Sequence, residues 1–224
     1  MIGFSIHKRR RKAPAEMVAR FRVLPVANIS DSMSRMSAGG ATLRPMHGGG
    51  VLCGPAFTVK TRPGDNLMLH KALDLAESGD VVVCDAGGDL TNALIGEMMI
   101  AHAIKRGLAG VVINGAIRDA AALRAGTFPV FAAGVTHRGP YKDGPGEINV
   151  PVALDGMVIA PGDLVVGDDD GLVAIPIAAL ADVLNATEAK HAAEEKQIAQ
   201  IRAGTSDRAW IDATLKRLGC ETET

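Results

Sequence analysis

Apolar runs that alternate with helical segments in the middle of the chain constrain the fold more than any other feature. Two short runs, residues 80–84 and 110–113, are continuous and rich in valine and isoleucine, as expected for strands buried on both faces. Residues 66–77 and 92–106 lie between and beside them and have the length and composition of helices. Because strands that alternate with helices are typical of βαβ units, the sequence predicts an α/β domain with a parallel sheet.

Shorter elements are expected on both sides of this centre. Ser30-Asp31 can cap a helix that continues to about Met36. From Glu147 onward the pattern changes to short β segments, and Asp168-Asp169-Asp170-Gly171 suits the turn of a hairpin. The last stretch is helical, charged and poor in apolar positions. We therefore place an α/β domain over residues 1–176 and a C-terminal helical extension, which packs on something beyond its own core, over residues 177–224.

Composition and charge narrow the classes of partner. The formal net charge is −1, so the surface as a whole does not attract nucleic acid or an anionic membrane. The basic run at residues 7–12 is interpreted as a solvated terminus, with nucleic-acid contact as the alternative. No apolar run suggests a membrane span and no signal peptide is recognised, so a cytoplasmic protein is expected. The three cysteines include no CxxC pair, which argues against a disulfide framework or a structural zinc site.

Polar residues follow the two predicted central strands. In open parallel sheets, ligands bind beyond the carboxyl ends of the strands. The first strand ends at Asp85 before a glycine-rich segment, and the second ends near Asn114, shortly before Arg118-Asp119. If these strands are neighbours, the two following loops are expected to face each other across one crevice.

Arg118-Asp119 and Gly96-Glu97 are the sharpest candidate site residues. An aspartate can bind a hard cation, and an arginine can bind a carboxylate or a developing oxyanion. The alternative is a surface arginine beside an aspartate that caps a helix. Gly96-Glu97 is expected near a helix start, where free N–H groups favour an anion; here the alternative is a favourable acid in the first turn. His70 could face the site or serve as a structural histidine.

Several motifs, taken in order, resemble the family of RraA-like proteins and 4-hydroxy-4-methyl-2-oxoglutarate aldolases. The resemblance runs from about Asn28 to Pro176. It is carried by residues 54–59, 63–67, 70, 79–83, 96–97, 115–119, 128–131, 150–152, 161–163 and 168–171.

This resemblance implies a three-layer β/β/α fold of the swivelling, phosphohistidine-domain type. It also implies a homotrimer, sometimes doubled to a homohexamer, with the crevice at a subunit interface. Members of the aldolase branch are class II enzymes that use Mg²⁺ or Mn²⁺. They cleave small 2-oxo diacids such as 4-hydroxy-4-methyl-2-oxoglutarate to pyruvate, and many decarboxylate oxaloacetate.

The resemblance also implies roles for individual residues. Asp119 matches the direct metal ligand and Arg118 the arginine that contacts the 2-oxo oxygen. Glu97 matches an acid that holds metal-bound water. The subsite for the pyruvoyl carboxylate matches Gly96 with the backbone amides of Met98 and Met99. In the C-terminal helix, either Glu194 or Glu195 matches an acid that reaches the neighbouring subunit's metal site.

Two points stay open at this stage. After Gly204 the chain has Thr205-Ser206-Asp207 in place of the glycine-rich turn of the aldolases, so the resemblance leaves the substrate undefined. Other RraA-like proteins are non-catalytic regulators that bind and inhibit the RNA-degrading endonuclease E. That function requires a protein partner and no metal, whereas the joint presence of Glu97, Arg118, Asp119 and an acidic C-terminal helix favours the enzyme.

Overall fold

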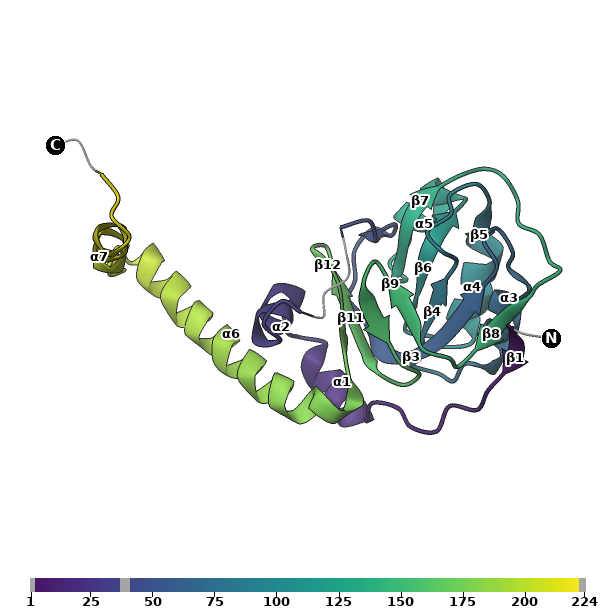
Figure 1. Ribbon diagram of the computed structural model, residues 1–224, viewed down its shortest axis with the longest axis horizontal. Coiled ribbons are helices and arrows are strands. Elements are labelled where there is room, and N and C mark those ends of the chain that lie inside the picture. The colour runs from purple at the N-terminus through teal and green to yellow at the C-terminus, as the bar shows by residue number, and fades with distance from the viewer. Residues whose placement is uncertain (1–2, 37–40, 222–224) are drawn as a thin grey trace.

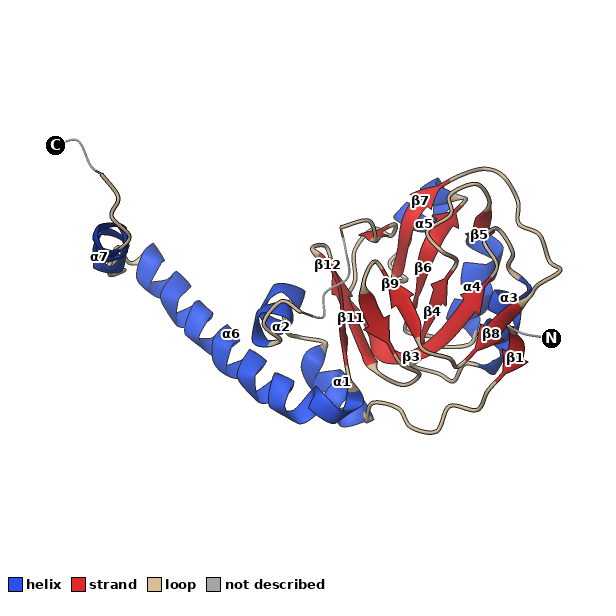
Figure 2. Ribbon diagram, viewed as in Figure 1, coloured by secondary structure: helices blue, strands red, loops and turns tan. Residues whose placement is uncertain are grey.

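A mostly parallel sheet forms the centre of the computed structural model, which describes residues 3–36 and 41–221. Its strands β3 (Leu52–Thr61), β4 (Val81–Asp85), β6 (Gly110–Ile117) and β7 (Val130–Val135) lie in this order and run parallel. Strand β5 (Ala93–Ile95) pairs in parallel with the end of β6. The predicted parallel α/β sheet is confirmed (Figure 2).

Three short strands complete the edges of this sheet. Strand β8 (Gly146–Ile148) runs antiparallel beside β3, and β1 (Phe4–Ile6) runs parallel beside β8. At the other edge, β2 (Arg44–Pro45) pairs antiparallel with β7. The first strand of the chain therefore lies next to a strand that comes more than a hundred residues later.

Helices cover one face of the sheet. They are α3 (Leu67–Leu75), α4 (Glu97–Lys105) and α5 (Ala120–Ala125), each of which follows a strand of the parallel set (Figure 1). Side chains alternate between the two faces of a strand, and Val82 and Cys84 of β4 lie in the core beneath these helices. The helices and the carboxyl ends of the strands they follow thus surround one end of the sheet.

A second β layer covers the opposite face. It consists of the hairpin β9 (Val152–Leu154) and β10 (Met157–Ile159) with the hairpin β11 (Leu164–Asp168) and β12 (Gly171–Ile175). Val81 of β4 lies in the core between this layer and the central sheet. Strand β11 also pairs with β3, which joins the layer to the sheet. The structure therefore has the expected β/β/α order of layers, and the hairpin turn at residues 168–171 is confirmed.

A third hydrophobic cluster lies on the outer side of β11 and β12. There α1 (Ala15–Phe21) and α2 (Val26–Ser32) pack with η1 (Ile177–Ala179) and the first turns of α6 (Leu180–Arg202). The beginning of the predicted extension is therefore part of a core that residues from the N-terminal region also build.

The remainder of α6 extends from the body of the molecule and carries α7 (Ala209–Arg217) at its far end (Figure 1). Beyond Thr187, none of the residues described up to 221 is buried. Exposed apolar side chains on this arm include Ile201 and Trp210. Within the described ranges, no helix has both the length and the apolar character needed to cross a membrane.

Two of the predicted helices differ from the structure. The helix expected over residues 92–106 is the short strand β5 followed by α4. A short apolar run cannot by itself distinguish a strand from a helix, and pairing with β6 decides the matter here. The sharp change at Gly96, whose backbone is extended, separates the two elements.

The helix expected to start at Ser30-Asp31 begins earlier, at Val26, directly after Pro25. Its first N–H, on Val26, donates to the Asp168 carboxylate at 2.9 Å. A side chain from the β11–β12 hairpin therefore supplies the cap, and no residue near α2 in the sequence could have indicated this.

Candidate active site

A cavity of about 260 Å³ opens at the carboxyl end of the sheet, beside β5 and between the starts of α3 and α4. It contains Arg118 and Asp119, which the sequence singled out, together with residues from three other segments. The lining consists of Asn66, His70, Ala93, Leu94, Ile95, Gly96, Met98, Met99, Arg118, Asp119, Pro140 and Lys142.

Asp119 has a left-handed backbone conformation, with φ 58° and ψ 35°. This is uncommon for a residue other than glycine and costs roughly 1 kcal/mol or more. Its carboxylate makes no capping hydrogen bond to its own helix, α5; instead, Oδ2 accepts the N–H of Glu97 at 3.0 Å. Asp119 Oδ2 lies 3.8 Å from Nε of Arg118, and both side chains are about half exposed. The carboxylate is thus held at the start of α4 and faces an open cavity.

Gly96 permits this close arrangement. A Cβ atom at this position would overlap Asp119 Oδ2 and would lie 2.9 Å from Cγ of Arg118. The backbone N–H of Arg118 also donates to the Ile95 carbonyl at 3.0 Å. The Arg118-Asp119 pair therefore packs directly against the junction of β5 and α4, where only glycine fits.

The guanidinium of Arg118 lies beside residues 138–142, a segment from which Pro140 and Lys142 line the cavity. Its Nη1 would be 3.6 Å from a Cβ atom built on Gly139. This segment is tied to the strand region by Asn92, whose side chain donates to the Gly139 carbonyl at 2.5 Å, and by the Ala93 N–H, which donates to the Arg138 carbonyl at 2.8 Å. The Arg118 side chain therefore lies between the backbone of Gly96 and the backbone of Gly139.

His70 and Lys142 add two basic groups to the cavity wall. Burial lowers the pKa of His70 below its usual 6.5, and the nearby charge of Lys142 lowers it further. The imidazole is consequently neutral at pH 7 and can accept a proton. The sequence suggested His70 as a site candidate but gave no indication of Lys142, which lies 72 positions further along the chain.

Asn66 is a buried polar residue in the same lining. Its Nδ2 donates to the Leu94 carbonyl at 2.8 Å, while Oδ1 has no hydrogen-bond partner within the described structure. Sequence reasoning placed Asn66 only at a helix start. Its contact with Leu94 depends on strand β5, which the sequence did not predict.

Asp65 connects two segments that line the cavity, the start of α3 and the segment around Lys142. Its buried carboxylate accepts N–H groups from Leu67, Asp143 and Gly144, at 2.8–2.9 Å. Burial alone would raise the pKa of Asp65, but these N–H groups and Arg62 together lower it below 3.8. One carboxylate thus joins the start of α3, which carries His70, to the segment that carries Lys142.

The start of α4 offers a limited set of free N–H groups. The N–H of Glu97 is taken by Asp119, and that of Met99 donates to the Gly96 carbonyl at 3.1 Å. No acceptor for the Met98 N–H is found in the part of the chain that the structure describes. Of the two amides that the resemblance pointed to, Met98 is therefore the one available to a ligand.

The side chain of Glu97 does not line this cavity. It lies in a neighbouring groove of about 760 Å³ between α4 and α5, whose other lining includes Ile100, Ile104 and Leu123. Glu97 therefore contributes its backbone to the position of Asp119, and the role of its carboxylate at a metal stays a prediction.

Glu194 and Glu195 lie on the projecting helix α6. Glu194 accepts a hydrogen bond from Asn28 at 2.7 Å and pairs with Lys190 at 3.0 Å, and these two contacts lower its pKa. Glu195 lies 3.7 Å from His191. Figure 1 shows α6 running away from the end of the molecule that carries α4 and β5, so neither glutamate joins the cavity within one chain.

The expected single crevice is divided into two: Gly87 and Gly88 line one hollow with Asn114, whereas Arg118 and Asp119 line the cavity beside β5. Strands β4 and β6 are parallel neighbours, and Asn114 donates to the Asp85 carboxylate at 2.9 Å. However, β6 continues to Ile117, which carries Arg118 beyond the loop that follows Asp85. Residues of that loop line a separate hollow with Thr42 and Asp155.

The donor set suits a hard cation that keeps part of its water shell. In the described ranges, no three His, Cys, Asp or Glu side chains are grouped as metal ligands. Mg²⁺ is commonly held by one or two carboxylates together with water and substrate oxygens. The exposed carboxylate of Asp119 fits that requirement, whereas a closed structural zinc site would need four protein ligands.

The β/β/α layers and the open cavity at the carboxyl end of the sheet, where the Asp119 carboxylate lies beside the Arg118 guanidinium, describe an α/β protein of one recognisable class. The chain belongs to the RraA-like family. A sequence model of that family, described as Aldolase/RraA, matches residues 26–174.

Among the similar proteins, one is named as an aldolase and two as RraA proteins. A protein of Halalkalibacterium halodurans, named "Putative 4-hydroxy-4-methyl-2-oxoglutarate aldolase", is 39% identical over 207 residues, covering 92% of this chain and 97% of the relative. The solved structure of the RNA-processing inhibitor RraA from Thermus thermophilis is 31% identical with a TM-score of 0.63, covering 68% of this chain and 92% of that one. Streptomyces coelicolor RraAS2, of the RNase ES inhibitor RraA family, is 26% identical with a TM-score of 0.75, covering 83% and 97%.

Proposed function

We propose that this protein is a class II aldolase that uses Mg²⁺ or Mn²⁺ to cleave 4-hydroxy-4-methyl-2-oxoglutarate-type 2-oxo acids to pyruvate. The same site would decarboxylate oxaloacetate. The observation that carries this proposal is the open cavity in which the Asp119 carboxylate and the Arg118 guanidinium meet at the start of α4. The name of the Halalkalibacterium halodurans relative supports the same activity.

The charges of the cavity favour a substrate with two carboxylates. Arg118, Lys142 and the start of α4 attract anions, and Asp119 is the one acidic side chain in the lining. The 1-carboxylate would bind near the Met98 N–H. The second carboxylate would then face Lys142, which lines the same cavity.

Carbon–carbon cleavage needs a cation at the 2-oxo oxygen and a base at the C4 hydroxyl. When bound at Asp119, the divalent metal supplies Lewis-acid polarisation of the 2-oxo group. Arg118 stabilises the negative charge that develops on the same oxygen. His70, which is neutral, accepts the C4 hydroxyl proton.

The C3–C4 bond then breaks, and its electron pair forms a pyruvate enolate while C4 becomes a carbonyl. Protonation at C3 gives pyruvate. Oxaloacetate loses CO₂ and leaves the same enolate, so Arg118 serves both reactions.

We further propose that the site is completed by a neighbouring subunit in a homotrimer or homohexamer. Asp119 is the one acid among the described residues that line the cavity, and Glu194 and Glu195 lie on the projecting helix α6, where Glu194 contacts Asn28 and Lys190 of its own chain. One of these glutamates would reach the neighbour's cavity.

A regulatory role is the second candidate, and the similarity to the Thermus thermophilis RNA-processing inhibitor favours it. In that role the chain would bind and inhibit the RNA-degrading endonuclease E without metal or turnover.

A coupled pyruvate assay tests the proposal. Oxaloacetate and 4-hydroxy-4-methyl-2-oxoglutarate are offered with Mg²⁺, with Mn²⁺ and with EDTA. We expect metal-dependent pyruvate release that falls about 100-fold or more in Arg118→Ala and in Asp119→Ala, because each removes a group that acts on the developing charge. Arg124→Ala changes an exposed arginine of α5 outside the cavity and serves as the control.

Pyruvate release that ignores EDTA, or near-normal turnover in either cavity variant, would overturn the aldolase assignment. Absence of turnover together with metal-independent inhibition of endonuclease E would establish the regulatory role instead.

A further inference from the structure

The basic run at residues 7–12 is a fixed strap and not a free terminus. It crosses the end of the molecule opposite the cavity, between β1 and α1 (Figure 1). At its start the His7 N–H donates to the Ile148 carbonyl at 3.0 Å, and just after its end the Ala13 N–H donates to the Gly162 carbonyl at 2.9 Å. Most side chains of the run are solvated, as interpreted, but its backbone is held at both ends.

Arg9 attaches the strap to the core. Its guanidinium donates to the buried Asp80 carboxylate at 2.9 Å and lies over the Phe57 ring, 5.5 Å from the ring centre. The Arg9 side chain is only 7% exposed, so this arginine is structural. Lys12 pairs with Glu77 at the edge of the same area.

The other basic side chains of the strap face solvent. Lys8, Arg10 and Arg11 are exposed, and in the described structure no carboxylate lies within 4.0 Å of their nitrogens. Holding like charges side by side on a fixed backbone is unfavourable unless an anion offsets them. The strap thus presents three cations that no carboxylate of residues 3–36 or 41–221 pairs with directly.

A second segment adds positive charge at the same end. Arg106, at the C-terminus of α4, donates to the carbonyls of Asp74 and Ala76, directly before Glu77. We call the surface formed by Lys8, Arg10, Arg11, Lys12 and Arg106 the basic end.

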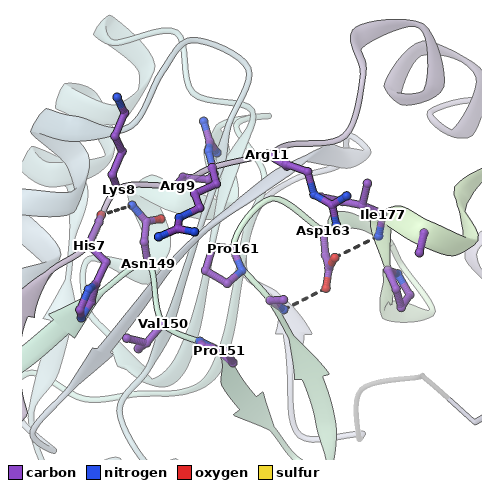
Figure 3. Close-up of a pocket in the computed structure, with 14 residues that line it drawn as sticks. His7, Lys8, Arg9, Arg11, Asn149, Val150, Pro151, Pro161, Asp163 and Ile177 are labelled. Atoms are coloured by element: carbon purple, nitrogen blue, oxygen red, sulfur yellow. Dashed lines mark hydrogen bonds between the residues drawn. The ribbon is translucent and has the colours of Figure 1, made fainter.

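A groove of about 670 Å³ runs beside the strap. Figure 3 shows Arg11 on the side of Asp163 and Ile177, while Lys8 points away from the groove. The Asp163 carboxylate already accepts N–H groups from Ala160 at 2.9 Å and Ile177 at 3.1 Å, which offsets part of its charge. No aromatic ring other than the imidazole of His7 lines the groove.

We propose that the basic end binds the phosphate backbone of single-stranded nucleic acid without reading its sequence. Lys8, Arg10 and Arg11 follow one another along the strap, so more than one phosphate can be met along its length. Lysine and arginine contacts to phosphates gain free energy by releasing counterions. Stacking of bases on aromatic rings, which gives stronger single-strand binding, has little support in this lining.

An acidic protein is the competing partner. Protein interfaces usually have an apolar centre, and residues 8–12 carry no large hydrophobic side chain, while the exposed Phe4 and Ile6 lie before the strap on β1. A surface of charge alone suffices for phosphate binding, so the composition of the basic end favours nucleic acid.

Fluorescence anisotropy with the full chain tests this proposal, using a labelled 15-nucleotide oligouridylate at 50 and 200 mM salt. The variant carries Arg10→Gln and Arg11→Gln, which remove two exposed charges without touching the Arg9–Asp80 contact. We expect binding to weaken about tenfold or more at 50 mM salt, and the slope of log K against log salt to become shallower by about 1.4, or 0.7 per lost contact.

The matched control carries Arg124→Gln and Lys216→Gln, an equal change of charge at exposed positions on α5 and α7. It should bind as the unaltered chain does, and circular dichroism should show that both variants are folded. The proposal is overturned if the chain does not bind the oligonucleotide at 50 mM salt, or if the control loses as much affinity as the strap variant. It is also overturned if polyglutamate of equal charge binds more tightly than the oligonucleotide.

Discussion

At the scale of single residues, Gly96 determines how closely the Arg118-Asp119 pair approaches the start of α4. The position tolerates no side chain, because a Cβ atom would overlap the Asp119 carboxylate. The local sequence marks Gly96 only as a possible helix start. A glycine is required at position 96 because of the contact with Asp119, which lies 23 positions later in the chain.

Gly96→Ala is expected to reduce kcat/KM for pyruvate release by about 100-fold, because the carboxylate must move by a substantial fraction of an ångström and catalytic geometry tolerates little displacement. Steady-state assays of the folded variant measure this. Gly126→Ala is the control, since a Cβ there meets only ordinary contacts at 3.6 Å and beyond. Equal activity of the two variants would contradict a catalytic position for Asp119.

The lowered pKa of His70 leads to a prediction about how kcat/KM depends on pH. Its lowered pKa means that the neutral imidazole is the main form above the usual 6.5 and that the proton is bound only at lower pH. The proposed reaction needs the neutral form, so kcat/KM should be level at neutral pH and decline only below pH 6.5. Lys142→Met removes one cause of the lowered pKa and should move this decline to higher pH.

His70→Gln should slow pyruvate release by roughly 100-fold or more and abolish the His70-dependent decline. The pH profile from pH 5 to 8 is the measurement. A decline at an unchanged pH in His70→Gln would show that another group accepts the proton.

At the scale of secondary-structure elements, polar side chains from distant segments decide where helices begin. Asp168 caps α2 across the molecule, and Asp65 joins the start of α3 to the segment at residues 143–144. Neither contact follows from local helix signals. The Asp168 contact sets where α2 begins and the Asp65 contact sets where α3 begins, whereas the hydrophobic pattern locates these helices only approximately.

Asp65→Asn should destabilise the fold by about 2–3 kcal/mol, because a buried carboxylate that accepts three N–H groups is replaced by an amide. The pKa of Asp65 is lowered in the folded state, so its contribution to stability is present above about pH 4 and is lost as the pH falls through the lowered value. The stability difference between the unaltered chain and the variant should therefore shrink in acid.

Urea unfolding at pH 7 and at pH 3 measures both effects. Asp169→Asn, in an exposed hairpin turn, should leave stability within about 0.5 kcal/mol. A cost for Asp65→Asn that does not depend on pH would contradict the electrostatic explanation.

At the scale of the whole molecule, the arm formed by the outer part of α6 and by α7 is unlike the rest of the chain. Its residues beyond Thr187 are unburied, and it carries exposed Ile201 and Trp210. Exposed apolar side chains on a projecting helix are typical of a surface that contacts another subunit. This supports the proposed assembly, in which the arm brings an acid to the neighbouring cavity.

Mixing two inactive variants tests that assembly. Asp119→Ala lacks the cavity carboxylate, and the double variant Glu194→Gln/Glu195→Gln lacks the arm acids. After dissociation and joint reassembly, some cavities would combine an intact Asp119 with a neighbour's intact glutamates, so pyruvate release should recover to a sizeable fraction of the normal rate. Each variant reassembled alone is the control. Failure to recover in verified mixed oligomers would show that the site does not use the neighbour's acids.

Local sequence patterns were enough to predict the parallel α/β core and the β11–β12 hairpin turn, and they singled out Arg118-Asp119 as a candidate motif. Buried strands and tight turns are encoded in residues close together in the chain, which is why a pattern of a few residues suffices. The family resemblance added the β/β/α layers, and the structure confirmed them.

Contacts between distant segments make residues 93–95 a strand, bring Lys142 and Asn66 into the cavity with Arg118, and hold the basic run across the opposite end. Each of these depends on hydrogen bonds or ion pairs between segments far apart in sequence. A short apolar run or a lone charged residue has several possible partners, and the folded chain selects one of them by bringing it within contact distance.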